Sequence, residues 1–180
     1  TAVTDLGALK DYDYVVVATG STPHKLRVEG AEKAVEACEY LLGEKPIGDR
    51  VIVVGGGLSG CEIALDLHRS GKTPIIVEMK NDLVAVKGVC LANSSYLRDY
   101  FELNKVEVHL ESKLVRITDK GAVIADKNGK EIEIEADSVI SSVGYKPAKE
   151  GGKVKLVGDC NGVGNLRTVV WRAWDVAMKI

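Results

Sequence analysis

The feature that most constrains this chain is a glycine-rich turn set between an apolar run and a helical pattern. Val51–Val54 is a short, unbroken apolar run, typical of a strand buried on both faces of a parallel sheet. Gly55, Gly57 and Gly60 follow it in G-x-G-x-x-G spacing. A helical pattern then extends over about 58–70. The order therefore predicts a buried strand, a tight turn and the N-terminus of a helix.

A second strand, predicted at Pro74–Val77, completes a βαβ unit and ends on an acidic residue, Glu78. In such a unit the first glycine permits the tight turn, the second lets the backbone approach a pyrophosphate, and the third allows close helix–strand packing. The helix N-terminus offers unpaired N–H groups to the phosphates. We therefore predict a dinucleotide site, with a glycine-rich turn of some other α/β domain as the alternative.

Glu78 is expected to select the dinucleotide. At the end of the second strand its carboxylate can accept hydrogen bonds from both hydroxyls of the adenosine ribose, and it would repel a 2′-phosphate. Lys80 could offset part of that repulsion, but no arginine stands nearby to bind a phosphate through two hydrogen bonds. The sequence favours NADH over NADPH, unless Glu78 only points to solvent.

Composition excludes several classes of protein. The 180 residues are 46% hydrophobic, enough for a buried core, and the net charge of −2 favours neither nucleic acid nor an anionic membrane as partner. No apolar run approaches the ~20 residues that span a bilayer. Four cysteines are present without a C-x-x-C pair, which indicates free thiols in a cytoplasmic protein. The absence of an initiating Met suggests a piece of a longer chain.

Together with the βαβ unit, the rest of the chain predicts an α/β fold: a Rossmann-like parallel sheet with a three-stranded β-meander, plus partial remnants of a second domain. Turn residues at 119–121 and 126–129 separate three short alternating segments, the pattern of a three-stranded meander. Asn165 can cap a last helix whose apolar stripe we expect to be core. The strands expected are Tyr12–Ala18, Val106–Leu110, Lys113–Thr118, Ala122–Ala125, Glu131–Glu135, Ser138–Val143 and Lys155–Val157, and the helices Ala34–Leu42 and Leu91–Leu103; the stripe consists of Leu166, Val169, Val170, Ala173, Val176, Ala177 and Ile180.

A short internal repeat relates two strands and their exits. The pattern D-x-V-[VI]-x-x-x-G-x-x-P occurs from Asp13 to Pro23 and again from Asp137 to Pro147. It predicts the same strand and turn in two places, as in a pair of similar nucleotide-binding halves of which only one is complete. A match this short can also arise by chance.

The order of motifs resembles the flavoprotein reductases with two dinucleotide domains. ATG-S-T-P is followed by G-x-G-x-x-G with its acid, then V-G-Y-K-P, then L-V-G-D-C before a helix. GGGLSGCEIALDL and the ending VGDCNGVGNLRTVVWRAWDVAMKI look most like the C-terminal part of the multidomain NADH:flavin oxidoreductases, the group of 2,4-dienoyl-CoA reductase, enoate reductase and trimethylamine dehydrogenase.

The resemblance implies an NAD(H) domain inserted into an FAD domain. It assigns 1–46 and 149–180 to partial FAD-domain segments and 47–148 to the NAD(H)-binding domain. Glu62 matches a glutamate near the nicotinamide, with a solvated helix residue as the alternative. The implied FAD-side residues are Ala18, Thr19, Gly20, Gly158 and Asp159, and the NAD(H) residues are Gly55, Gly56, Gly57, Leu58, Ser59, Gly60, Glu62, Glu78, Met79, Lys80 and Gly144.

The family's FAD-binding G-x-G-x-x-G, its FMN barrel and its iron–sulfur cysteines would lie upstream and are absent from this sequence. The link Ala148–Gly152 is shorter than the family leads us to expect. The resemblance thus implies an NAD(H)-binding fragment of an FAD-dependent oxidoreductase that passes hydride from NADH to FAD. Its partners would be the dinucleotide and the missing FAD and FMN domains, and the fragment alone would be inactive.

We predict no catalytic side chain, because nicotinamide and flavin supply the chemistry of hydride transfer. The three histidines are scattered, and no metal-ligand spacing occurs. Two alternatives stay open: a module that holds ADP or NAD without turnover, and a degenerate scaffold that binds no nucleotide. The sequence does not identify the final electron acceptor or the oligomeric state.

Overall fold

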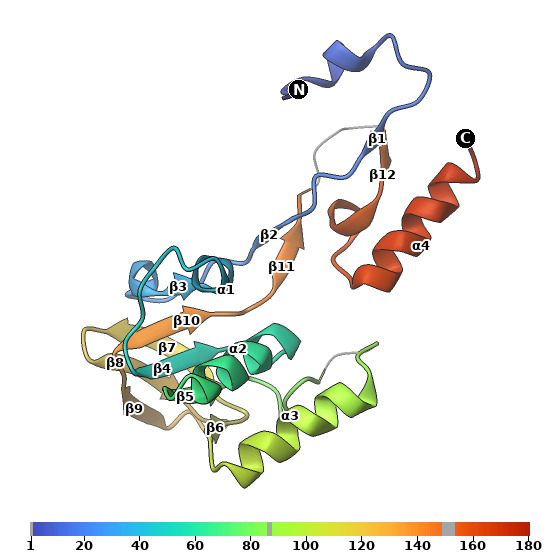
Figure 1. Ribbon diagram of the computed structural model, residues 1–180. Helices are drawn as coiled ribbons and strands as arrows, with labels where there is room; N and C mark the ends of the chain where they lie inside the picture. Colours follow the sequence, from blue (N-terminus) through green and yellow to red (C-terminus); the bar gives the residue numbers. More distant parts are fainter. Residues whose placement is uncertain (1, 86–87, 149–153) are drawn as a thin grey trace. The chain divides into compact units, whose positions relative to one another are not determined.

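The computed structural model describes residues 2–85, 88–148 and 154–180. The chain forms two compact units (Figure 1). One unit contains Thr1–His24 together with Tyr145–Ile180, and the other is Lys25–Gly144. The predicted NAD(H) domain, 47–148, falls almost entirely within the second unit.

A five-stranded parallel sheet is the centre of the Lys25–Gly144 unit, and it confirms the Rossmann-like fold predicted from the sequence. Its order is β3-β10-β4-β5-β6. β4 lies in the middle, where every residue but the first is buried, as its apolar run predicts. The strands are β3 (Val35–Glu36), β4 (Arg50–Val54), β5 (Thr73–Val77), β6 (Glu107–His109) and β10 (Ser138–Ser141).

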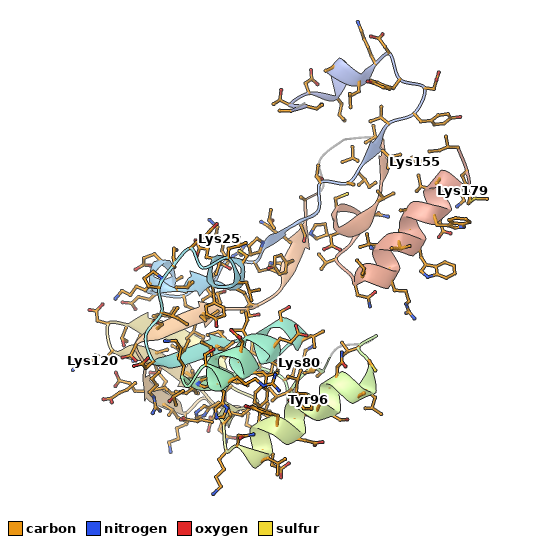
Figure 2. All side chains as sticks on the ribbon, viewed as in Figure 1. Lys25, Lys80, Tyr96, Lys120, Lys155 and Lys179 are labelled. Atoms are coloured by element: carbon orange, nitrogen blue, oxygen red, sulfur yellow. The ribbon has the colours of Figure 1, made fainter. Side chains whose placement is uncertain are left out.

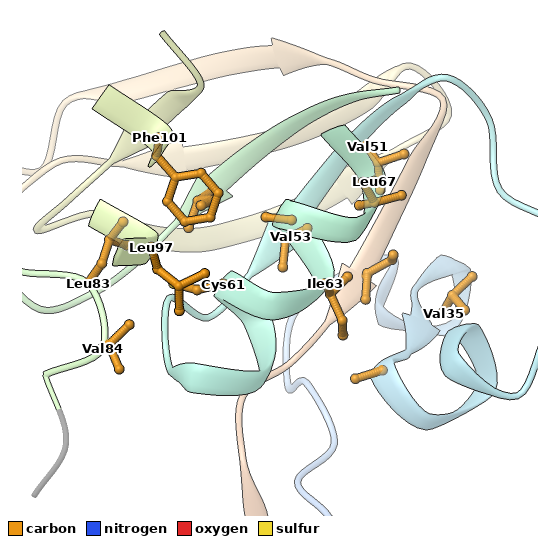
Figure 3. Packing of buried hydrophobic residues seen from close by; sticks show 14 residues of the cluster. Val35, Val51, Val53, Cys61, Ile63, Leu67, Leu83, Val84, Leu97 and Phe101 are labelled. Atoms are coloured by element: carbon orange, nitrogen blue, oxygen red, sulfur yellow. The ribbon is translucent and has the colours of Figure 1, made fainter. Parts of the chain in front are cut away.

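The two faces of this sheet carry different layers. Val51 and Val53 of β4 pack with the helices α1 (Ala37–Leu41), α2 (Leu58–Arg69) and α3 (Leu91–Leu103), as Figure 3 shows for the α2 and α3 side. Ile52 and Val54 point the opposite way and pack against the β-meander. This alternation follows from the period of two along a strand.

The predicted three-stranded meander is confirmed. β7 (Lys113–Thr118), β8 (Gly121–Ala125) and β9 (Glu131–Glu135) pair antiparallel in that order. In β9 the three glutamates are exposed and Ile134 is buried, which is the pattern of one wet and one dry face.

The other unit is built from short elements. β1 (Val16–Val17) pairs parallel with β12 (Lys155–Leu156), and β2 (Ser21–Pro23) pairs antiparallel with β11 (Tyr145–Pro147). The 3-10 turns η1 (Leu6–Leu9) and η3 (Gly158–Asn161) and the helix α4 (Leu166–Ala177) complete it; a further 3-10 turn, η2 (Ala31–Lys33), belongs to the sheet unit.

The internal repeat has a structural counterpart. In both copies a strand leads to a glycine with positive φ, +76° at Gly20 and +87° at Gly144, and then to a short strand that ends on proline. These two short strands pair with each other, with Pro23 opposite Tyr145 and Pro147 opposite Ser21. Glycine adopts a positive φ without the steric cost that other residues have, so the shared glycine fixes the same turn twice.

Two predicted elements are wrong in extent. Tyr12–Ala18 forms only the two-residue strand β1, because its partner β12 is equally short, and Tyr12 and Tyr14 are exposed. Helix α1 begins at Ala37 rather than at residue 34, since Val35 pairs with β10 and the Glu36 and Glu39 side chains cap the helix start. Residues 25–46 accordingly group with the parallel sheet. The short link at 148–152 lies largely outside the described residues.

The prediction that the α4 stripe is core is also wrong. Asn165 caps this helix as expected, its side chain accepting the Thr168 N–H at 3.1 Å. No residue of α4 is buried, however, and the exposed fractions are 82% for Leu166 and 60% for Val170. Figure 2 draws these side chains, with Lys179 just beyond the helix end. An amphipathic pattern predicts that a helix has an apolar face. It does not predict which part of the protein covers that face.

No helix among the described residues is long and apolar enough to cross a membrane.

Candidate dinucleotide site

The glycine loop, which we define as residues 55–60, lies at the topological switch point of the parallel sheet. From β4 the chain runs through α2 to β5 on one side, and it returns later as β10 on the other side. In open α/β sheets, ligands bind at the carboxyl edge where the strand order reverses in this way. The loop occupies that edge, between the end of β4 and the N-terminus of α2.

Two of the three motif glycines are required by the fold itself. Gly55 has φ +109°, and a Cβ built on it would lie 2.3 Å from the Ser142 carbonyl oxygen. A Cβ on Gly60 would lie 1.9 Å from the Gly55 carbonyl oxygen, so α2 sits against the loop at a distance that no side chain allows. These positions are glycine because β4, β10 and α2 approach one another closely.

Gly57 differs from both. Its φ is −70°, which any residue adopts, and no heavy atom of the described chain lies within 4 Å of a Cβ built there. Nothing inside the protein requires glycine at this position. A glycine here makes physical sense when an external group approaches the backbone, and a dinucleotide pyrophosphate at the start of α2 is such a group. The loop thus fits the nucleotide that the motif predicts.

Glu78 lies at the end of β5 and binds the glycine loop directly. Its Oε2 accepts the Gly56 N–H at 2.6 Å, and its Oε1 accepts the Lys80 N–H at 2.8 Å. The alternative that Glu78 only points to solvent is therefore wrong. Each carboxylate oxygen can accept a further hydrogen bond. Glu78 can therefore hold the glycine loop and still accept hydrogen bonds from the hydroxyls of a ribose.

The remaining predicted NAD(H) residues lie on α2, just beyond β5 and after β10. Leu58 and Ser59 form the first turn of α2, and Met79 beyond β5 is 75% exposed. Lys80 donates its ammonium N–H to the Ala85 carbonyl oxygen at 2.9 Å. Glu62 is exposed on α2, and Gly144 follows β10 with φ +87°.

The predicted FAD-side residues form local hydrogen bonds within their own unit. Thr19 donates its hydroxyl to the Ala148 carbonyl oxygen at 2.9 Å. Asp159 accepts from the Ser21 hydroxyl at 3.2 Å and from the Gly164 N–H at 3.1 Å. Ala18 and Gly20 flank Thr19 between β1 and β2, and Gly158 begins η3 with φ +68°.

Cys61, His68 and His109 each form a hydrogen bond within the protein. Cys61 lies under the glycine loop, where burial raises the pKa of its thiol to about 12, so it stays protonated and donates to the Gly56 carbonyl oxygen at 3.4 Å. His68 pairs with Tyr100 and His109 with Glu107. Among the described residues no cluster of His, Cys, Asp or Glu could hold a metal ion.

Sequence reasoning missed a set of residues that hold the loop from outside the motif. The Val84 N–H donates to the Gly56 carbonyl oxygen at 2.7 Å, and Arg98 of α3 holds the segment before Val84. This segment has no periodic pattern, and Arg98 lies 16 positions from Asp82, so the sequence offered no signal for these contacts.

A parallel sheet with a glycine loop at its switch point defines a Rossmann-like domain. The family model for pyridine nucleotide-disulphide oxidoreductases matches residues 3–168, and this chain belongs to that family. The predicted cofactors, NAD(H) and FAD, are those of NADH-dependent flavoprotein reductases in this family, and the resemblance to such reductases is confirmed.

Two relatives match most of the chain. A cinnamate reductase of Clostridium sporogenes is 41% identical over 177 residues, covering 93% of this chain and 26% of that protein. An NADH oxidase of Thermoanaerobacter brockii is 30% identical over 183 residues, covering 93% and 28%. The chain therefore spans about a quarter of the length of these relatives.

Solved structures agree on the fold. A 2-naphthoyl-CoA reductase in complex with 2-naphthoyl-CoA has a TM-score of 0.83 at 25% identity, covering 93% of this chain and 27% of that one. The thioredoxin reductase of T. acidophilum has a TM-score of 0.69 at 21% identity, covering 90% and 62%, and shows the fold alone.

Proposed function

We propose that this chain binds NAD(H) at the glycine loop and that, in a full-length flavoprotein, it holds NADH for hydride transfer to FAD. The observation that carries the proposal is the open space at Gly57. Glycine is required there only if an external group approaches the backbone, whereas Gly55 and Gly60 are required by the fold. When bound, NADH supplies the hydride and FAD accepts it. Calorimetric titration with NADH tests the proposal, and we expect one site per chain.

The chain's own residues would bind and orient the nucleotide. The Gly57 and Leu58 N–H groups at the start of α2 are among those that a helix leaves without intrahelical partners, and they would bind the pyrophosphate. Glu78 would accept from the adenosine ribose, and Glu62, one turn into α2, would lie toward the nicotinamide. In our proposal no side chain of this chain donates or removes a proton during hydride transfer.

We further propose that the unit containing α4 belongs to an FAD-binding domain whose other part lies in the rest of the parent protein. Relatives about four times as long support this, since they provide chain that could cover α4. The apolar stripe of α4 is the face to be covered, and it is exposed, with Leu166 at 82% and Val170 at 60%. Four free cysteines support a cytoplasmic location.

The alternative is a module that holds ADP or NAD without turnover. Mixing NADH with the full-length flavoprotein separates the two functions, because bleaching of the flavin absorbance occurs only if hydride passes.

We predict that NADH binds at least ~10-fold more tightly than NADPH, or by about 1.4 kcal/mol. The Glu78 carboxylate would repel a 2′-phosphate, and the Lys80 ammonium is hydrogen-bonded to a backbone carbonyl group. Glu78→Ala also removes the Gly56 hydrogen bond, which should weaken both cofactors. The ratio of the two dissociation constants is therefore the readout. Equal affinities in the wild type, or a ratio unchanged by Glu78→Ala, would remove Glu78 from this role.

We also predict that the isolated chain does not retain FAD. Gly158 and Asp159 are present, but the sequence contains a single G-x-G-x-x-G, which we assign to NAD(H). Without a second phosphate-binding loop, much of the binding energy for FAD is missing. Chain purified with excess FAD should lose the flavin absorbance on gel filtration. A yellow protein peak with stoichiometric flavin would contradict this.

A further inference from the structure

The glycine loop is held by two peptide groups in series. The Val84 N–H donates to the Gly56 carbonyl oxygen at 2.7 Å. That oxygen belongs to the same planar peptide as the Gly57 N–H, and in a trans peptide the C=O and N–H bonds point in opposite directions. A hydrogen bond that fixes the Gly56 carbonyl therefore also fixes the direction of the Gly57 N–H, which points away from Val84.

The Val84 N–H is fixed in the same way. It shares its peptide with the Leu83 carbonyl oxygen, and Arg98 of α3 donates to that oxygen through Nη2 at 2.6 Å. The same guanidinium is held by Asp82, with Nε to Oδ1 and Nη2 to Oδ2 both at 2.8 Å. One planar fork thus binds a carboxylate through two hydrogen bonds and a carbonyl through a third, a combination that the single ammonium of lysine does not reproduce.

The backbone at Val84 is strained. Its φ is +51°, a region that β-branched residues rarely adopt. Val84 is nevertheless 3% exposed and packs with Leu83, Cys61 and Leu97 in the core that Figure 3 shows. Strain of this kind persists only where surrounding contacts enforce it, and it concentrates at ligand sites. Here the contacts that enforce it are the Arg98 hydrogen bonds on one side and the Gly56 carbonyl on the other.

We propose that Arg98 is a positioning residue for the dinucleotide phosphates, acting through the Leu83–Val84 peptide and then the Gly56–Gly57 peptide. The inference rests on the proposed NAD(H) function. The series begins at a cation and ends at the N–H of Gly57, the N-cap residue of α2. Hydrogen bonds in such a chain polarise one another, so the arrangement both aims the last N–H and strengthens it as a donor to an anion. The Gly56 N–H is bound to Glu78 and takes no part.

The test compares Arg98→Gln with Arg69→Gln in calorimetric titrations with NADH and with ADP. Arg69 is a matched control, since it lies on α2, donates to the Tyr96 hydroxyl at 2.6 Å and carries the same charge, but it does not contact the loop. We expect Arg98→Gln to weaken both ligands at least ~10-fold and Arg69→Gln to change them less than ~2-fold. Adenosine, which lacks phosphates, should bind Arg98→Gln as it binds the wild type, a result that a general loosening of the fold would not give.

If Arg98→Gln does not fold, Arg98→Lys takes its place, because lysine keeps the positive charge and the ion pair with Asp82. We expect Arg98→Lys to weaken NADH binding at least ~3-fold. Suppose that the wild type binds NADH and that a folded Arg98→Gln or Arg98→Lys variant binds it equally well. This result would overturn the positioning role of Arg98 and leave the proposed function intact. Equal losses for adenosine and ADP would also overturn it. A wild-type chain that does not bind NADH would overturn the proposed function and this role together.

Discussion

Replacing Gly57 with valine is expected to weaken NADH binding at least ~100-fold, or by about 2.7 kcal/mol, and to leave the chain folded. A Cβ at Gly57 meets nothing inside the protein, so the valine side chain occupies the space assigned to the pyrophosphate. Glycine is a better N-cap than valine, and the loss is of the order of 1 kcal/mol. For a chain of this size that corresponds to a fall in Tm of about 2–4 °C.

Gly57→Ala provides the graded control for this experiment. Its smaller side chain should weaken NADH binding less than valine does, while both variants keep the circular dichroism spectrum of the wild type. Unchanged affinity in a folded Gly57→Val protein would show that no ligand approaches the backbone at this position.

Gly60→Ala is expected to lower the stability of the fold, whereas the substitutions at Gly57 act mainly on NADH binding. Its Cβ would lie 1.9 Å from the Gly55 carbonyl oxygen, and that atom is backbone and cannot rotate away. Helix α2 would have to move off the loop, against a packed core that includes Cys61 and Ile63. We expect a loss of about 2–3 kcal/mol or more in the free energy of unfolding, measured by urea denaturation.

The comparison of the same substitution at two glycines of one motif separates fold from function. Gly57→Ala should unfold at a slightly lower urea concentration than the wild type, because alanine is also a poorer N-cap than glycine, and Gly60→Ala at a clearly lower one. If the two alanine variants were equally stable, the close approach of α2 to the loop would not be a property of the protein in solution.

The sequence was sufficient to predict the centre of this fold. An unbroken apolar run, a glycine turn and an amphipathic helix are each determined by local rules, and β4, the loop and α2 follow them. The meander was equally predictable, because strict alternation and turn residues mark each strand. The parallel order of the sheet could be expected only from the βαβ pattern, since no local signal pairs β10 with β4.

Periodicity and residue composition gave wrong predictions where burial or strand length depends on the element that packs against a helix or pairs with a strand. The α4 stripe has the period of a buried helix face, yet Leu166 and Val170 are exposed, since burial requires a partner that the pattern does not specify. Tyr12–Ala18 has the composition of a strand, but β1 is only as long as its partner allows.

The candidate site shows the same division. The motif identified the glycine loop and Glu78, but not that Glu78 binds the Gly56 N–H. Arg98 and Val84 could not be found from sequence, because their role depends on two peptide groups brought together by the packing of α3 against α2. Predictable residues are those in the motif, and the residues that orient it come from elsewhere in the fold.

NADH binding at the glycine loop is tested most directly by titrating the isotopically labelled chain with NADH and monitoring its backbone amide resonances by two-dimensional NMR. We expect the largest shifts at Gly57, Leu58 and Ser59, followed by Glu78, and we expect Gly57→Val to abolish them. Saturating NADH that leaves these resonances in place, or that shifts only amides far from the glycine loop, would contradict the claim that this loop is a dinucleotide site.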